Sequence, residues 1–228
     1  MSMGLAVPAS IAPGETGRGI LVAVIDSGIN FQHPHLGIPG RGLAVERGPE
    51  GLSVRPGAHA DRYGHGTCCA ALVHALAPEA GLLAIRVTAD RPTTDAERLA
   101  RGIEVAAEAA AQILLVPLGT KTVLTVVREA VARALAQGCA IVAPRPEPDL
   151  QPGDLPGVLG VQVRDGVDVA QAGGVWVADG RARAAEGQAS NFYGPSLSAA
   201  RVAAALARDA QARGGLDVQG FKKTVPVL

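Results

Sequence analysis

The chain of 228 residues has few aromatic side chains and few cysteines. Aromatic residues make up 3% of the sequence, so aliphatic side chains must fill the core, and a hydrophobic fraction of 48% is ample for that. The three cysteines, Cys68, Cys69 and Cys139, are odd in number and two are adjacent. This pattern excludes a disulfide framework and indicates thiols in a reducing compartment. It also leaves no second Cys or His pair at the spacing of a zinc site.

The chain also lacks an excess of charge and a long hydrophobic run. Its 21 basic and 21 acidic residues give a formal net charge of zero, which predicts no nucleic-acid partner and no membrane partner. No apolar run reaches the roughly 18 residues of a membrane-spanning helix. The N-terminal stretch has no basic region, and Pro8 and Pro13 interrupt its apolar pieces, unlike a secretory signal. A cytoplasmic location is expected, and the oligomeric state is left open.

Strand-like apolar runs alternate with helix-like segments along most of the chain. Strands are predicted at 20–26, 82–87, 113–119, 139–143 and 158–163, with a weaker pair within 168–183, and helices at 65–77, 95–111, 125–138 and from 196 onward. The Gly/Pro-rich stretch that ends near Gly57 carries no predicted strand. The alternation predicts a doubly wound α/β fold, with a mostly parallel sheet and helices on both faces. We expect an N-terminal tail at 1–16, a single domain at 17–210 and a C-terminal tail at 211–228.

Three short segments carry residue types with catalytic chemistry. VAVIDSGINFQHPHL places Asp26 at the carboxyl end of a predicted strand, the edge at which ligands bind in open α/β sheets. DRYGHGTCCAALV begins a helix with His65 between two glycines, and GPSLSAARVAAAL begins one with Ser196. Taken alone, each residue has a structural reading. Asp26 could close a turn, His65 could be an ordinary helix residue, and Ser196 could be a helix cap.

Together, the three segments resemble the signature blocks of the subtilisin-like serine proteases, in that family's order of Asp, His and Ser. The run LLVPLG stands where the family has its substrate-binding strand, which points to Leu118 and Gly119. The resemblance covers roughly residues 17–208. It implies a compact, divergent member of that family with Asp26, His65 and Ser196 as a catalytic triad, no cofactor, and a peptide or protein substrate.

The chemistry of these residue types agrees with that resemblance. A serine hydroxyl is a poor nucleophile until a neighbouring imidazole takes its proton. The imidazole in turn needs a carboxylate that fixes its tautomer and stabilises its protonated form. His65 is then the base, Asp26 its orienting partner and Ser196 the nucleophile. The start of a helix also places backbone N–H groups beside the negative charge that develops on the substrate.

The chain departs from the family in the oxyanion region. After the strand at 139–143, the family has an Asn whose side chain donates to the oxyanion. An ungapped alignment puts Glu147 at that position, and no Asn occurs between His65 and Ser190. An ionised carboxylate cannot donate a hydrogen bond and repels an oxyanion. In a subtilisin, losing this donor costs about 10²–10³ in rate. The expected oxyanion region therefore consists of Ser196 and Glu147.

Smaller departures lie nearby. Pro195 removes a backbone N–H directly before Ser196, and Pro117 stands where the family usually has Ser, which weakens antiparallel pairing with a peptide. His35 stands where the family has an Asp ligand of calcium, and the helix after His65 has no calcium-binding insertion, so no metal is expected. Only a short tail precedes the first strand, in place of a pro-domain, which favours an intracellular protein.

The sequence supports two functions. The first is an intracellular serine endopeptidase that hydrolyses peptide bonds in a narrow peptide substrate, for example in the maturation of a precursor peptide. The alternative is a catalytically impaired protein of the same fold that binds a peptide or protein partner without cleaving it. Cysteine chemistry at Cys68 or Cys69 is disfavoured, because a cysteine early in such a helix is more often buried.

Overall fold

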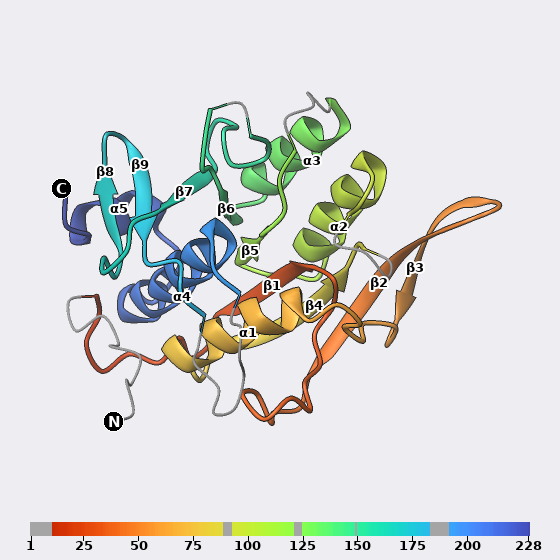
Figure 1. Cartoon of the computed structure of the whole chain (residues 1–228), viewed down its shortest axis with the longest axis horizontal. Helices are drawn as coiled ribbons and strands as arrows, with labels where there is room; N and C mark the ends of the chain where they lie inside the picture. The colour runs from red at the N-terminus through yellow and green to blue at the C-terminus, as the bar shows by residue number, and fades with distance from the viewer. Residues whose placement is uncertain (1–10, 89–92, 121–124, 149, 183–191) are drawn as a thin grey trace.

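A nine-stranded sheet formed by the described residues runs through the molecule (Figure 1). The computed structural model describes residues 11–88, 93–120, 125–148, 150–182 and 192–228. The strand order is β3-β2-β4-β1-β5-β6-β7-β9-β8. The strands are β1 Leu21–Asp26, β2 Arg41–Gly48, β3 Gly51–Pro56, β4 Gly81–Arg86, β5 Ile113–Leu115, β6 Ala140–Pro144, β7 Leu159–Val163, β8 Ala170–Ala172 and β9 Val175–Ala178.

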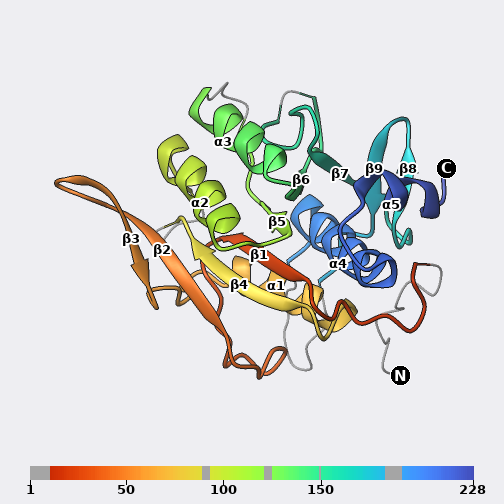
Figure 2. The same cartoon turned by 180° about the vertical axis from the view of Figure 1, so that it is seen from behind.

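The central strands are parallel, so helical crossovers connect them, and these helices cover both faces of the sheet. In β1, Val22 and Val24 pack into one core with helices α1 (His65–Leu76) and α4 (Pro195–Arg213). Ala23 and Ile25 pack into the other core with α2 (Ala96–Glu108) and α3 (Thr125–Ala136). Figures 1 and 2 show these two helix pairs on opposite sides of the sheet. Strands buried on both faces consist of continuous aliphatic runs, as LVAVID does. The predicted α/β fold class is confirmed.

A hairpin of β2 and β3 was missing from the sequence prediction. These two strands pair antiparallel at one edge of the sheet, and the hairpin extends beyond the body of the molecule (Figure 1). β2 shows no clean alternation of apolar and polar residues, whereas in β3 Leu52 and Val54 pack against the core and alternate with the exposed Ser53 and Arg55. No strand was predicted between β1 and Gly57, and that prediction was wrong.

The C-terminal segment packs onto the body of the protein. Residues 211–228 were expected to be a tail, but α4 continues to Arg213 and a short helix, α5, spans Val218–Thr224. The ring of Phe221 is fully buried and stacks on Trp176, with ring centroids 4.8 Å apart. One aromatic anchor thus packs the segment that was expected to be a tail. Of the predicted N-terminal tail, residues 1–10 lie outside the described residues, and Ile11 is buried.

The fold brings three element ends to one place. Asp26 is the last residue of β1, His65 is the first residue of α1, and Ser196 is the second residue of α4. In parallel α/β sheets, the carboxyl ends of the strands and the helix starts that follow them form the ligand-binding edge. Within the described residues, no helix is both long enough and apolar enough to cross a membrane.

Candidate active site

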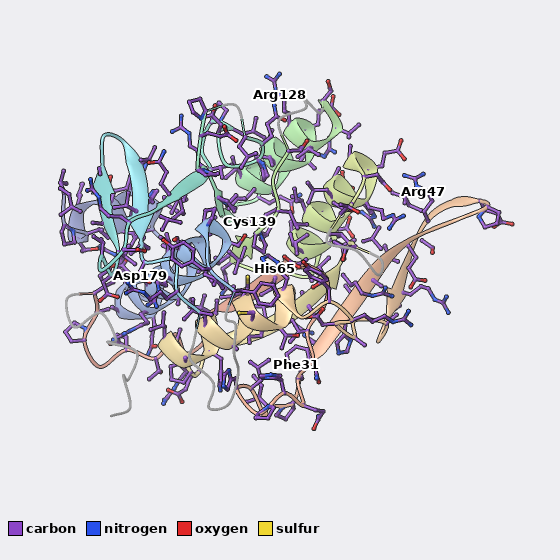
Figure 3. All side chains as sticks on the ribbon, viewed as in Figure 1. Phe31, Arg47, His65, Arg128, Cys139 and Asp179 are labelled. Atoms are coloured by element: carbon purple, nitrogen blue, oxygen red, sulfur yellow. The ribbon has the colours of Figure 1, made fainter. Side chains whose placement is uncertain are left out.

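Asp26 and His65 form a hydrogen-bonded pair. Asp26 is buried, with 1% of its surface exposed. Its Oδ2 lies 2.7 Å from Nδ1 of His65. The other carboxylate oxygen of Asp26 accepts the N–H of Ser27 at 2.5 Å. An ionised carboxylate only accepts, so this geometry assigns the proton to Nδ1 and leaves Nε2 as an acceptor. Figure 3 shows His65 at the start of α1, near the centre of the molecule.

A second carboxylate, Asp61, organises the loop that enters α1. It accepts the backbone N–H groups of Tyr63, Gly64 and Thr67 at 2.8–2.9 Å and the hydroxyl of Thr67 at 2.5 Å. The N-cap residue Gly64 has a left-handed φ of 95° and no side chain, so Asp61 supplies the acceptor that the helix start needs. Burial raises the pKa of Asp61, but these hydrogen bonds outweigh burial and hold the pKa below its usual value. The role of Asp61 was not predicted from the sequence. An Asp three residues before the N-cap glycine of a helix could have indicated it.

The surroundings of His65 favour its protonated form. Burial lowers the pKa of His65, whereas the hydrogen bond to Asp26 and the negative charges of Asp26 and Asp61 raise it. The net result is a pKa above the usual value. A raised pKa makes His65 a stronger acceptor for the proton of a nucleophile.

Ser196 lies in the same cleft as His65 but bonds elsewhere. Its Oγ donates to the backbone carbonyl of Pro117 at 2.9 Å. Among the described residues, no hydrogen bond joins Ser196 Oγ to His65, and no acceptor binds the backbone N–H of Ser196. The next two N–H groups, of Leu197 and Ser198, both point to the carbonyl of Gly194. Ser196 therefore offers a free N–H donor at the positive end of α4.

The cleft has a volume of about 600 Å³. It is lined by Tyr63, His65, Thr93, Thr94, Asp95, Ala96, Leu99, Pro117, Leu118, Gly119, Thr120, Phe192 and Ser196. Leu118 and Gly119, the predicted substrate-binding residues, both lie on its wall. A Cβ at Gly119 would be 2.7 Å from the side chain of Leu150, so only glycine fits there without a shift. Tyr63 and Phe192 were not predicted as site residues.

The structure does not bring Glu147 to this cleft. Glu147 is exposed in the loop after β6 and is not among the described residues that line the cleft. Arg145 forms an ion pair with Asp154. The backbone at Gly153 packs directly on the end of β6, since a Cβ at Gly153 would be 2.0 Å from the carbonyl oxygen of Pro144. An ungapped alignment places Glu147 at the family's Asn, but Glu147 is not among the described residues that line the cleft. Its role at the oxyanion stays a prediction.

The cysteines have unreactive surroundings. Cys69 is fully buried, and burial raises the pKa of its thiol well above the usual range. Burial raises the pKa of Cys68 to about 11. Thiols with raised pKa values contain little of the nucleophilic thiolate at neutral pH. Within the described ranges, no cluster of His, Cys, Asp and Glu is arranged to hold a metal ion.

Comparisons with known proteins agree on one family and one fold. A model of the subtilase family matches residues 17–144, which include Asp26 and His65 and end before Ser196. Subtilisin Savinase of Lederbergia lenta is 32% identical over 147 residues, which is 60% of this chain and 51% of that protein. Subtilisin E of Bacillus subtilis (strain 168) is 30% identical over 145 residues, or 60% of this chain and 36% of that protein. The matches thus span about half or less of these relatives.

Solved structures extend the likeness to nearly the whole chain. Sphericase superimposes with a TM-score of 0.79 at 21% identity, covering 95% of this chain and 86% of that one. A cold adapted subtilisin-like serine proteinase superimposes with a TM-score of 0.72 at 19% identity, covering 92% of this chain and 82% of that one. At these identities, the likeness shows the fold, including the part of the chain that holds Ser196.

Proposed function

This chain belongs to the subtilase family, and from that premise we propose that it is a serine endopeptidase with Asp26, His65 and Ser196 as its catalytic triad. The observation that carries the proposal is the 2.7 Å contact between Asp26 and His65, beside a cleft that His65 and Ser196 both line. A buried carboxylate bonded to an imidazole beside a serine is the arrangement that activates a hydroxyl.

The reaction follows from the roles of these three side chains. The hydroxyl of Ser196 turns from the carbonyl of Pro117 toward Nε2 of His65, which takes its proton as Oγ attacks the scissile carbonyl carbon. Asp26 stabilises the imidazolium that forms. His65 then gives the proton to the leaving amine, and an acyl group remains on Ser196. A water molecule, activated by the same imidazole, hydrolyses this acyl group and restores the serine.

The start of α4 stabilises the oxyanion in this proposal. The unpaired N–H of Ser196 and the positive end of the α4 dipole lie where negative charge develops on the substrate oxygen. Glu147, outside the cleft lining, supplies no donor in this arrangement. We therefore expect hydrolysis slower than that of a subtilisin with its Asn donor, by up to about 10²–10³.

We propose in addition that the substrates are a narrow set of peptides or proteins and that the protein acts in the cytoplasm. A precursor peptide that is cut at one site is an example of such a substrate. The thiols of Cys68, Cys69 and Cys139 are unpaired, which is typical of a reducing compartment and supports that location.

Labelling by a fluorophosphonate tests the proposal. We expect covalent labelling of the native protein and complete loss of the label in Ser196→Ala. The matched control is Ser198→Ala, two residues further along α4, because the hydroxyl of Ser198 is buried and donates to the carbonyl of Ala178. Ser198→Ala should keep the label. Absence of labelling in the folded native protein would contradict the proposal.

The alternative function is a peptide-binding protein without cleavage. The observation that favours it is the hydroxyl of Ser196, which bonds to the carbonyl of Pro117 and not to His65. This alternative predicts that Ser196→Ala binds a peptide ligand as tightly as the native protein does. It also predicts that no product forms on long incubation of native protein with that ligand.

A further inference from the structure

Two of the three exposed aromatic rings of this chain line the cleft that contains His65. The sequence has only three Phe, two Tyr and one Trp. Phe31, Trp176 and Phe221 are buried, whereas Tyr63, Phe192 and Tyr193 are 42%, 41% and 60% exposed. Exposed aromatic surface in a cleft is common at binding sites, because a ligand that buries this apolar surface removes it from water.

Phe192 contacts His65, and Tyr63 contacts Phe192. The ring of Phe192 meets the imidazole edge to face, with centroids 5.6 Å apart and an interplanar angle of 77°. The ring of Tyr63 is tilted against that of Phe192, with ring centroids 6.2 Å apart. Gly64 stands between Tyr63 and His65 in sequence, and a Cβ there would lie 3.9 Å from the Phe192 ring. The loop before α1 and the segment before α4 thus each contribute one ring.

Both rings also line the cleft that contains Ser196. A substrate bond placed between Ser196 Oγ and His65 therefore brings a neighbouring substrate side chain against Phe192 and Tyr63. The cleft lining also includes the polar residues Thr93, Thr94 and Asp95. Tyr63 and Phe192 contribute the aromatic surface of the lining.

We infer that Tyr63 and Phe192 form a binding site for one large apolar side chain of the substrate, aromatic or branched aliphatic, next to the bond that is cleaved. The position relative to a cleaved bond rests on the proposed function, whereas the apolar binding site does not. Offset and edge-to-face contacts with such a side chain stabilise the complex beyond simple burial.

A purely structural role for the rings makes a different prediction. If Phe192 only shielded His65 from water, its removal would lower turnover of every peptide by the same factor and leave binding selectivity unchanged. A binding site instead predicts a loss confined to peptides with a large apolar residue at one position. We expect that residue to improve binding about tenfold over alanine, from partial burial of its side chain.

The experiment uses the full chain with the Ser196→Ala change, so that binding is measured without cleavage. Peptides are selected on this protein from a displayed random library, and each position of a selected peptide is then changed to Ala. We expect one position at which Phe or Leu binds about tenfold more tightly than Ala. Adding Phe192→Ala or Tyr63→Ala reduces that ratio to about twofold, and Phe192→Tyr keeps it.

The matched control is Tyr193→Ala, which removes an exposed ring of the same segment that does not line the cleft and whose hydroxyl donates to Asp165. This control keeps the tenfold ratio. An unchanged ratio in Phe192→Ala, or selected peptides without enrichment of large apolar residues, overturns the inference. Cleavage of the same peptides by the native protein is scored separately. Loss of the ratio without any cleavage would sink the peptidase proposal and leave the binding site intact.

Discussion

The acid–base half of the candidate site and its nucleophile half are held in different ways. Asp26 and His65 are bonded to each other, and Ser27 braces both, because its N–H donates to Asp26 and its hydroxyl accepts the N–H of Gly66 at 3.0 Å. Ser196 instead bonds to the backbone of Pro117, 79 residues earlier in the chain. The proposed base, His65, is thus already bonded to its partner, whereas the proposed nucleophile, Ser196, must turn before it can react.

This difference follows the division that the family comparison makes. The acid–base half lies in residues 17–144, where the family model matches, and short sequence blocks determine it locally. The nucleophile half depends on the course of the loop after β6 and on the residues around Gly194, where the chain departs from the family. A fixed base and a movable nucleophile predict that substrate binding completes the site, since a peptide N–H can compete for the carbonyl of Pro117.

The largest expected effect comes from breaking the better-built half. Asp26→Asn keeps the shape of the side chain but offers an N–H where Nδ1 of His65 needs an acceptor. In another serine protease this change lowers kcat by about 10⁴, and we expect a similar loss in peptide hydrolysis here. The control is Asp165→Asn, an exposed carboxylate near the nucleophile segment, which should retain activity. A loss below tenfold in Asp26→Asn would mean that Asp26 does not orient His65 for catalysis.

A second substitution tests how rigid that half is. A Cβ at Gly66 would lie 2.2 Å from the carbonyl oxygen of Gly28, so Gly66→Ala must push α1 away from the backbone that follows β1. We expect a loss of about 1–3 kcal/mol in the free energy of unfolding. Displacing His65 should also lower kcat/KM about 10²-fold. Gly215→Ala, where a Cβ meets nothing within 4 Å, should change stability by less than about 0.5 kcal/mol. Equal stabilities of the two variants, measured in urea, would contradict a tightly packed base.

The pH dependence of kcat/KM distinguishes the effect of Asp61 on His65 from that of Asp26. Catalysis needs neutral His65, and its raised pKa places the acidic limb of kcat/KM above the usual value of 6.5. Asp61→Asn removes one negative charge that raises this pKa, so the limb should move to lower pH, with the plateau changed less than about threefold. The contribution of His65 to the free energy of unfolding changes with pH in the opposite direction, because it is largest at low pH. The raised pKa stabilises the fold below the unfolded pKa, this contribution disappears as pH rises through the folded pKa, and Asp61→Asn reduces it. An unmoved limb would show that Asp61 acts only on the loop.

The sequence sufficed for the parts of the fold that rest on local patterns. The aliphatic run ending at Asp26 predicted β1, and the turn residues around His65 and Gly138 predicted where α1 begins and α3 ends. The hairpin of β2 and β3 was missed, because β2 follows no regular period and the alternation in β3 spans only the four residues from Leu52 to Arg55. The packing of α5 could not be predicted either, because Phe221 is fixed by a stack on Trp176 that only the folded chain brings together.

The candidate site shows the same limit. Asp26 and His65 were found from blocks that specify their own geometry, and the structure joins them. Tyr63 and Phe192 were missed because their meeting over His65 requires two segments far apart in the chain. Glu147 was assigned by counting residues across a Pro-rich loop, and such loops do not keep a constant path between relatives.

The smallest expected effect is at Glu147. This test bears most directly on the difference between the acid–base half and the nucleophile half of the site. An ionised carboxylate at the oxyanion would oppose the reaction, so Glu147→Ala would then raise kcat/KM tenfold or more. A protonated carboxyl acting as donor would give the reverse, a loss of about 10²–10³. The exposed position outside the cleft lining predicts neither. We expect less than a twofold change in peptide hydrolysis, as for an ordinary surface substitution. A small effect would leave the N–H of Ser196 as the oxyanion donor, and the nucleophile half would then rest on the start of α4.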